Sequence, residues 1–109
     1  MSEGSRSQKI ALIVKEAAAQ IIETESNKTA LITVTNCTVS DDFKTAMLYI
    51  SVLPEEGSDS ALNFVKRKRR EIRDSVKKRL AMNRIPFIDV IIDAGEQNRQ
   101  KIDQLLREG

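Results

Sequence analysis

The sequence contains no histidine and no tryptophan, and Cys37 is its only cysteine. Without histidine the chain lacks the commonest general base and metal ligand in proteins. A single cysteine cannot form an intramolecular disulfide, so a reducing compartment, by default the cytoplasm, is expected. Because Cys37 has no histidine partner, we interpret it as a small buried hydrophobe rather than a nucleophile. We therefore expect neither an enzyme nor a protein with a metal, a cofactor or a small-molecule substrate.

Aromatic residues, glycines and long apolar runs are also scarce. The four aromatic residues are too few for the stacking of many bases to be the main binding mode. The four glycines stand alone at positions 4, 57, 95 and 109 and form no phosphate-binding loop. No apolar stretch approaches the roughly 18 residues that a membrane span requires, and residues 1–8 form no apolar signal segment. No membrane partner is expected.

Basic charge is abundant, and it is concentrated in one segment. The net charge of the chain is +2, whereas residues 66–84 contain ten Lys or Arg and two acidic residues. This segment alone carries +8, so the rest of the chain carries −6. A solvated helix face usually mixes both signs, and an excess of this size is typical of a nucleic-acid binder. The candidate RNA-binding residues are Lys66, Arg67, Lys68, Arg69, Arg70, Arg73, Lys77, Lys78, Arg79 and Arg84.

Hydrophobic periodicity predicts a helix followed by a hairpin. Apolar residues at spacings of three and four indicate a helix over 9–25, with Ser7 as its N-cap and residues 1–8 as a flexible tail. Residues 30–39 and 45–53 are rich in β-branched residues or alternate in polarity, which predicts two strands. Residues 40–42 join them as a turn. Asp41 and Asp42 are also readable as a carboxylate pair or metal ligand, but turn formation explains them better.

A second, longer helix is predicted after the loop at 54–58, with Asp59 or Ser60 as its cap. It should run to about Asn83, because Pro86 disfavours helical geometry in the residue before it. Its apolar stripe consists of Leu62, Val65, Ile72, Val76 and Leu80. The stripe is broken where Lys68 and Arg69 stand in place of an apolar residue. An interruption of the helix is therefore expected over 68–70.

The remaining elements define the fold class. Residues 87–92 predict a third strand, and Asp89 and Asp93 beside it should face solvent or cap the last helix. Gly95 opens a short terminal helix with apolar positions at 102, 105 and 106. A right-handed crossover would place the third strand beside the first and parallel to it. The expected structure is a single α+β domain over 1–109, a three-stranded mixed sheet with helices on one face.

This element order is that of a type II K-homology (KH) fold with an added C-terminal helix. KH domains clamp single-stranded RNA with a Gly-x-x-Gly loop between two helices. Here residues 68–70 occupy that place, so contacts between basic side chains and the phosphates of a folded RNA are expected instead. Two alternatives differ in class: a protein-interaction module whose basic helix docks on an acidic partner, and an enzyme, for which the sequence offers no set of converging polar groups.

The residues of the hairpin, the long helix and the terminal helix carry a resemblance to one family. From about residue 6 to residue 106 the chain resembles ribosome-binding factor A, a bacterial small-subunit assembly factor. The family's Ala-x-Gly kink is replaced here by residues 68–70. The positions that match are Asp42, Ala46 and Tyr49 in the hairpin, Ile72, Arg73 and Leu80 in the long helix, Pro86 and Asp93 around the third strand, and Ile102, Leu105 and Leu106 at the end.

This resemblance implies that the protein binds the immature 30S subunit, contacts small-subunit ribosomal RNA and assists its late maturation, including processing at the 5′ end. It also implies a monomer that acts without a cofactor and leaves when the subunit is mature. Arg73 matches the family motif directly. The other nine basic residues are inferred from charge.

Overall fold

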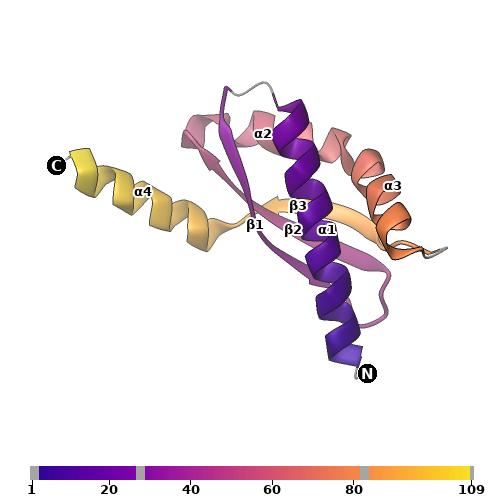
Figure 1. Ribbon diagram of the computed structural model, residues 1–109. Helices are drawn as coiled ribbons and strands as arrows, with labels where there is room; N and C mark the ends of the chain where they lie inside the picture. The colour runs from indigo at the N-terminus through magenta and orange to yellow at the C-terminus, as the bar shows by residue number, and fades with distance from the viewer. Residues whose placement is uncertain (1–2, 27–28, 82–83, 109) are drawn as a thin grey trace.

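A computed structural model describes residues 3–26, 29–81 and 84–108 of the chain. Three strands form one sheet, and the helices follow in the expected α+β order (Figure 1). No helix among the described residues is both long enough and apolar enough to cross a membrane. The elements are α1 (Glu3–Glu25), β1 (Leu31–Val39), β2 (Thr45–Leu53), the 3-10 turn η1 (Glu55–Gly57), α2 (Ser58–Arg67), α3 (Arg69–Leu80), β3 (Phe87–Ile92) and α4 (Ala94–Glu108).

The core lies between one face of the sheet and helices α1, α2 and α3. Alternate residues of β2 point into it and are fully buried, as period-two patterning predicts. The expected stripe of the long helix is also confirmed, with Val65, Ile72 and Val76 fully buried and Leu62 and Leu80 packed at the edge. The largest fully buried side chains are Leu48, Ile50, Ile72, Val14, Val52, Val65 and Val76.

The expected position of the third strand is wrong. β3 lies beside β2 and parallel to it, with Thr45 paired to Phe87 and Ile50 to Ile92, so the sheet order is β1-β2-β3. The reason is geometric. A helical crossover about as long as β2 returns the chain to the start of that strand, and the free edge of β2 is then the nearest pairing partner.

Helix α1 begins at Glu3 instead of Lys9, so Ser7 lies inside the helix and is not its cap. The expected flexible tail is therefore helical from Glu3 onward, and residues 1–2 lie outside the described part. A tertiary contact supports this early start: the Arg6 guanidinium lies 5.2 Å from the centre of the Phe43 ring.

The caps of the long helix also differ from expectation. α2 begins at Ser58 with Gly57 as N-cap and no capping side chain, so Asp59 and Ser60 lie within its first turn. α3 ends at Leu80, where Ala81 adopts a left-handed φ of 51°. The predicted end near Asn83 lies outside the described residues.

β1 contains a bulge that simple alternation does not predict. Its pairing with β2 shifts between Val34 and Asn36, so that Cys37 rather than Asn36 follows Val34 into the core. The Thr35 hydroxyl at the bulge lies 2.7 Å from Asp93 Oδ2, and donates to it. This bond joins β1 to the end of β3 across the sheet.

Gln97 anchors α4 to the sheet beyond the end of β3. Its Oε1 accepts a hydrogen bond of 2.8 Å from the backbone N–H of Val52, and its amide nitrogen donates to the Val52 carbonyl. The side chain therefore pairs with β2 as another strand residue would. Past this anchor α4 projects away from the sheet (Figure 1), and Ile102, Leu105 and Leu106 remain exposed.

Removing this anchor is expected to destabilise the fold. Gln97→Met leaves the buried N–H and C=O of Val52 without partners, and each unsatisfied group costs about 1 to 3 kcal/mol. We expect the free energy of unfolding, measured by urea titration, to fall by about 2 to 6 kcal/mol. Asn98→Ala, on the exposed side of the same helical turn, is the control and should change it by less than about 1 kcal/mol. Equal stabilities of the two variants would contradict the proposed pairing.

Val76 tests the buried face of α3. Val76→Asp places an unpaired carboxylate in the fully buried layer between α3 and the sheet, which should cost at least about 3 kcal/mol. That is a large share of the roughly 5 to 15 kcal/mol available to a small domain. Thermal unfolding followed by circular dichroism measures the loss, with Lys78→Asp on the exposed face as the control. A Val76→Asp protein that melts like the unsubstituted chain would mean that another face of α3 is buried.

Candidate nucleic-acid interface

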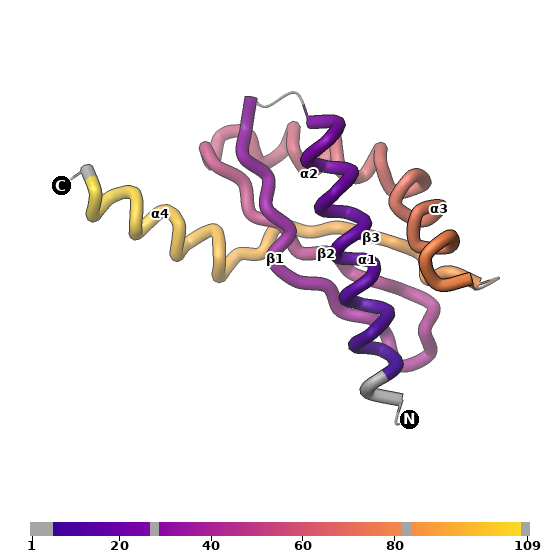
Figure 2. The backbone as a smooth tube through the Cα atoms, viewed as in Figure 1, coloured from indigo at the N-terminus to yellow at the C-terminus, as the bar shows by residue number. Residues whose placement is uncertain are grey.

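The predicted interruption of the basic helix is confirmed at Lys68. α2 ends at Arg67, Lys68 has φ −94° and ψ 1°, and α3 begins at Arg69. The backbone stays hydrogen-bonded through the break: Lys68 N–H donates to Val65 O and Ile72 N–H to Lys68 O, each at 3.0 Å. Figure 2 shows the change of direction between α2 and α3. A charged residue thus occupies the point where a straight apolar stripe would have continued.

Lys68 forms ion pairs with acidic residues of the protein. Its Nζ lies 3.1 Å from Glu25 Oε1 at the end of α1 and 3.4 Å from Glu71 Oε1 on α3. It also lies 5.7 Å from the centre of the Phe64 ring. The hydrogen bond to Glu25 raises the pKa of Lys68, so the ammonium stays charged. Lys68 fixes the break in the basic helix against the end of α1.

Arg69 is held in a similar way, but by β3. Its Nη1 lies 3.5 Å from Asp89 Oδ1, and its guanidinium lies 5.5 Å from the centre of the Phe87 ring. The Asp89 side chain remains 39% exposed, as one of its two predicted roles requires, but it pairs with Arg69 and does not cap the last helix. Asp93 does act as a cap, since its Oδ1 accepts the Glu96 N–H at 3.1 Å. Hydrogen bonds from the Thr35 hydroxyl and that N–H lower the pKa of Asp93.

The other eight predicted residues present their charges to solvent. All eight are exposed, and over the described ranges none of them forms an ion pair with an acidic residue. Arg79 donates to the neutral Gln20 side chain on α1. Arg70, Arg73 and Lys77, spaced three and four apart, share one face of α3. These eight residues, which we call the basic ridge, are Lys66, Arg67, Arg70, Arg73, Lys77, Lys78, Arg79 and Arg84.

Two further basic residues near the interface were not among the RNA-binding residues predicted from the sequence. Arg6 on α1 and Lys44 after the hairpin turn lie with Arg73 and Arg84 around one pocket of about 400 Å³. The four residues come from separate parts of the chain, so no local run of charge connects them. Only the fold brings them together.

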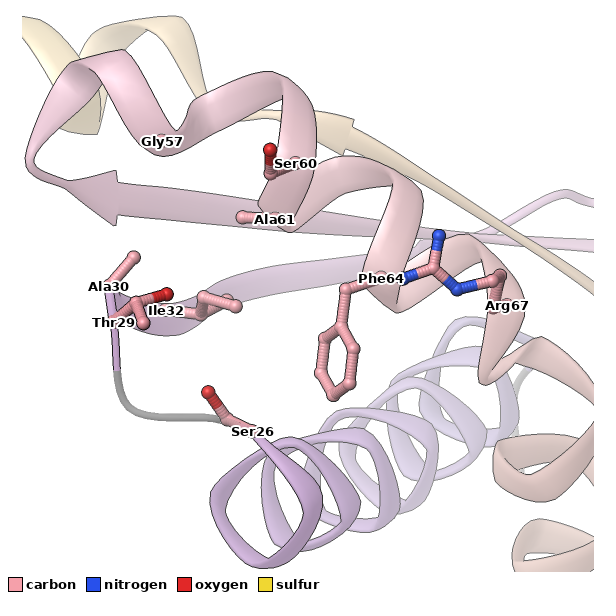
Figure 3. Close-up of a pocket in the computed structure, with 9 residues that line it drawn as sticks. All are labelled: Ser26, Thr29, Ala30, Ile32, Gly57, Ser60, Ala61, Phe64 and Arg67. Atoms are coloured by element: carbon pink, nitrogen blue, oxygen red, sulfur yellow. The ribbon is translucent and has the colours of Figure 1, made fainter.

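A second pocket, of about 240 Å³, lies at the other end of the molecule between α1, α2 and the start of β1. Figure 3 shows Phe64 and Arg67 on α2 on one side of it, with Ala30 and Ile32 opposite. Among the described residues, its polar lining consists of the hydroxyls of Ser26, Thr29 and Ser60 and the Arg67 guanidinium, with no carboxylate or thiol that could act as a general base beside them. Arg67 is its one member of the basic ridge.

The residues considered for catalysis or metal binding have structural roles here. Burial raises the pKa of the Cys37 thiol to about 11, which keeps it protonated. Asp42 Oδ1 accepts hydrogen bonds from Ser40 Oγ at 2.7 Å and from Lys44 N–H at 3.0 Å, which confirms the predicted turn. These bonds lower the pKa of Asp42. Across the described ranges, no three potential metal-binding side chains of His, Cys, Asp or Glu cluster together.

The mixed three-stranded sheet, the helices on one of its faces and the interrupted basic helix define a KH-like domain. The family model described as "Ribosome-binding factor A" matches residues 6–106. The chain belongs to the ribosome-binding factor A family, as the motifs of the hairpin and long helix indicated. Members of this family are ribosome-binding assembly factors and not enzymes.

Individual relatives agree with this assignment. The chain is 32% identical over 110 residues to ribosome-binding factor A of Thermodesulfovibrio yellowstonii, covering 99% of this chain and 93% of that protein. It is 30% identical over 105 residues to the Desulfitobacterium hafniense factor, covering 94% and 84%.

Solved structures support the fold. The crystal structure of ribosome-binding factor A from Thermus thermophilus matches with a TM-score of 0.67 at 23% identity, covering 79% of this chain and 94% of that one. A Thermus thermophilus homology model fitted into a cryo-EM map of a 30S complex matches with a TM-score of 0.60 at 26% identity, covering 72% and 86%.

Proposed function

We propose that this protein binds the immature 30S subunit, contacts its ribosomal RNA and assists late maturation and rRNA processing. The observation that carries the proposal is the basic ridge, presented by α2, α3 and the segment before β3 in a chain that belongs to the ribosome-binding factor A family. The whole chain acts as one KH-like domain and as a monomer in the cytoplasm, without a cofactor.

Phosphate contacts supply the binding energy. Lysine and arginine side chains on a rigid element neutralise phosphates and release counterions, which requires no base to be exposed. The ridge meets this requirement because α3 is fixed on its opposite face by Ile72 and Val76 and at its start by Lys68 and Arg69. The basic side chains are therefore held at fixed distances from one another, and a folded RNA whose phosphates have a matching arrangement can contact them.

Lys68 and Arg69 have a separate role in this proposal. Both were predicted to contact RNA, but both are engaged with acidic residues of the protein itself. We assign them the task of orienting the ridge, and we assign RNA contact to the other eight residues. Single-strand clamping in the manner of a Gly-x-x-Gly loop has no counterpart at this break.

Co-sedimentation tests the proposal. Purified protein is sedimented with free small subunits or with mature 70S ribosomes, and is separately passed over a resin that carries an immobilised acidic protein. We expect the protein to travel with small subunits, to be released from them as salt is raised, and to bind neither the mature ribosomes nor the resin. Retention on an acidic protein that survives nuclease treatment would favour the protein-interaction module instead.

A further inference from the structure

The pocket between Arg6, Lys44, Arg73 and Arg84 has a strongly positive rim. Its rim contains these four cations and one carboxylate, Asp42. That carboxylate is already engaged by the Ser40 hydroxyl and the Lys44 backbone N–H inside the turn. The rim therefore keeps a net charge of +3, drawn from α1, the hairpin turn, α3 and the segment before β3. These like charges repel each other, and a bound anion would offset that repulsion.

The pocket also has an apolar wall. Ile85 and Pro86 are buried behind it, and the half-buried Phe43 ring lies at its side under the Arg6 guanidinium. A purely phosphate-binding site would need no such surface. Apolar and aromatic atoms beside a cationic rim suit a ligand that has both an anionic group and a flat ring, as a nucleotide does.

Phe43 is held in an unusual backbone conformation. Its φ is 61°, in the left-handed region that bulky residues rarely adopt and where such a residue costs about 1 to 3 kcal/mol. The turn fixes it there through Phe43 N–H donating to Ser40 O at 2.9 Å. Strain of this kind is maintained by the surrounding structure and concentrates at binding sites. Here it directs the ring toward Arg6 and the pocket.

We propose that this pocket binds one unpaired nucleotide of the RNA. Arg6, Arg73 and Arg84 hold its phosphate, and its base lies against the Phe43 ring and the wall behind it. The occupant is unpaired because the bases of an A-form duplex are not accessible to such a wall. A volume of about 400 Å³ suits a single nucleotide rather than a longer strand. The inference rests on the proposed RNA-binding function and adds one specific contact to it.

Amide chemical shifts of the full-length 15N-labelled protein test the pocket directly. The probes are adenosine 5′-monophosphate, adenosine and inorganic phosphate, each at the same ionic strength. We expect the monophosphate to shift the amides of residues 42–44 and 84–85 most strongly, and to bind several-fold more tightly than either other probe. Shifts that are absent, or that spread evenly along α3, would overturn the assignment, as would equal binding of inorganic phosphate.

Variants make the test specific. Arg6→Gln with Arg84→Gln should weaken binding of the monophosphate about tenfold or more, since charged hydrogen bonds are lost. Lys15→Gln with Arg107→Gln removes the same amount of charge outside the pocket and should leave the affinity for the monophosphate unchanged. Phe43→Gly keeps the turn, because glycine accepts a φ of 61°, and should reduce the monophosphate to the affinity of inorganic phosphate.

Small-subunit binding separates this inference from the proposed function. The Phe43→Gly variant, which keeps every charge of the basic ridge, should bind small subunits several-fold more weakly than the unsubstituted protein. If the unsubstituted protein binds small subunits and the Phe43→Gly variant binds them equally well, the pocket assignment fails and the proposed function stands. If the unsubstituted protein does not bind small subunits, the proposed function fails whatever the monophosphate titration gives.

Discussion

Replacing Lys77, Lys78 and Arg79 with Glu is expected to abolish binding to the small subunit while the domain stays folded. The three side chains lie in the last turn of α3 and are exposed. Their reversal changes the ridge by six charge units and replaces attraction to phosphate with repulsion. The cost to the fold should be small, because the buried face of α3 is untouched. Glutamates at the end of a helix oppose its dipole by only about 0.3 to 1 kcal/mol each.

The measurement is co-sedimentation with small subunits at a fixed salt concentration, with circular dichroism and urea unfolding to show that the variant is folded. Lys15, Lys101 and Arg107 replaced with Glu form the control, since they carry the same change in charge outside the ridge. We expect the control to retain most of its binding. A folded triple variant of α3 that sediments as the unsubstituted protein does would place the interface elsewhere.

Much of the fold was predictable because local patterns agree with the final packing. The bounds of β2 and β3 are those that alternation predicts, since each strand places one apolar face on the helices. The break at Lys68 follows from a charge standing at a core position, which no straight helix could bury. The turn at 40–42 follows from short polar side chains that bond their own backbone.

What could not be predicted depends on contacts between distant residues. The position of β3 beside β2 depends on the length of the crossover relative to the strand. The bulge in β1 turns Cys37 inward, and the Thr35 hydroxyl at the bulge bonds to Asp93, 58 residues further along the chain. Gln97 reads as an ordinary surface residue of a helix until it is seen to pair with Val52. None of these leaves a local signal in the sequence.

The candidate interface, too, was predictable from the sequence only in part. A local run of charge predicted the ridge, but the run could not show which cations the protein uses for its own stability. Lys68 and Arg69 face Glu25 and Asp89, which stand 43 and 20 residues away along the chain. Substituting Lys68 or Arg69 should mainly change the orientation of α3. Removing a ridge residue should act on the RNA contact itself, and this difference can be measured.

Binding is expected to weaken steeply with salt. Each phosphate neutralised contributes about 0.7 to 0.9 to the slope of log affinity against log salt. If about five of the eight ridge residues contact phosphates, the slope should be near −4. Raising the salt from about 50 to about 200 mM should then weaken binding by a factor on the order of several hundred. A single nucleotide in a pocket adds little to this slope, so the ridge dominates it.

Two single substitutions separate contact from orientation in that titration. Lys78→Ala removes an exposed ridge charge and should reduce the magnitude of the slope by about one, weakening unrelated RNAs in parallel. Lys68→Ala removes a charge already engaged by Glu25 and Glu71, so it should leave the slope nearly unchanged and lower stability instead. A slope near zero for the unsubstituted protein, or tight preference for a short single-stranded oligonucleotide, would rule out phosphate contact as the main source of affinity. With most of the energy in phosphates, preference for the immature subunit must come from the shape of its RNA, because phosphates carry no sequence information themselves.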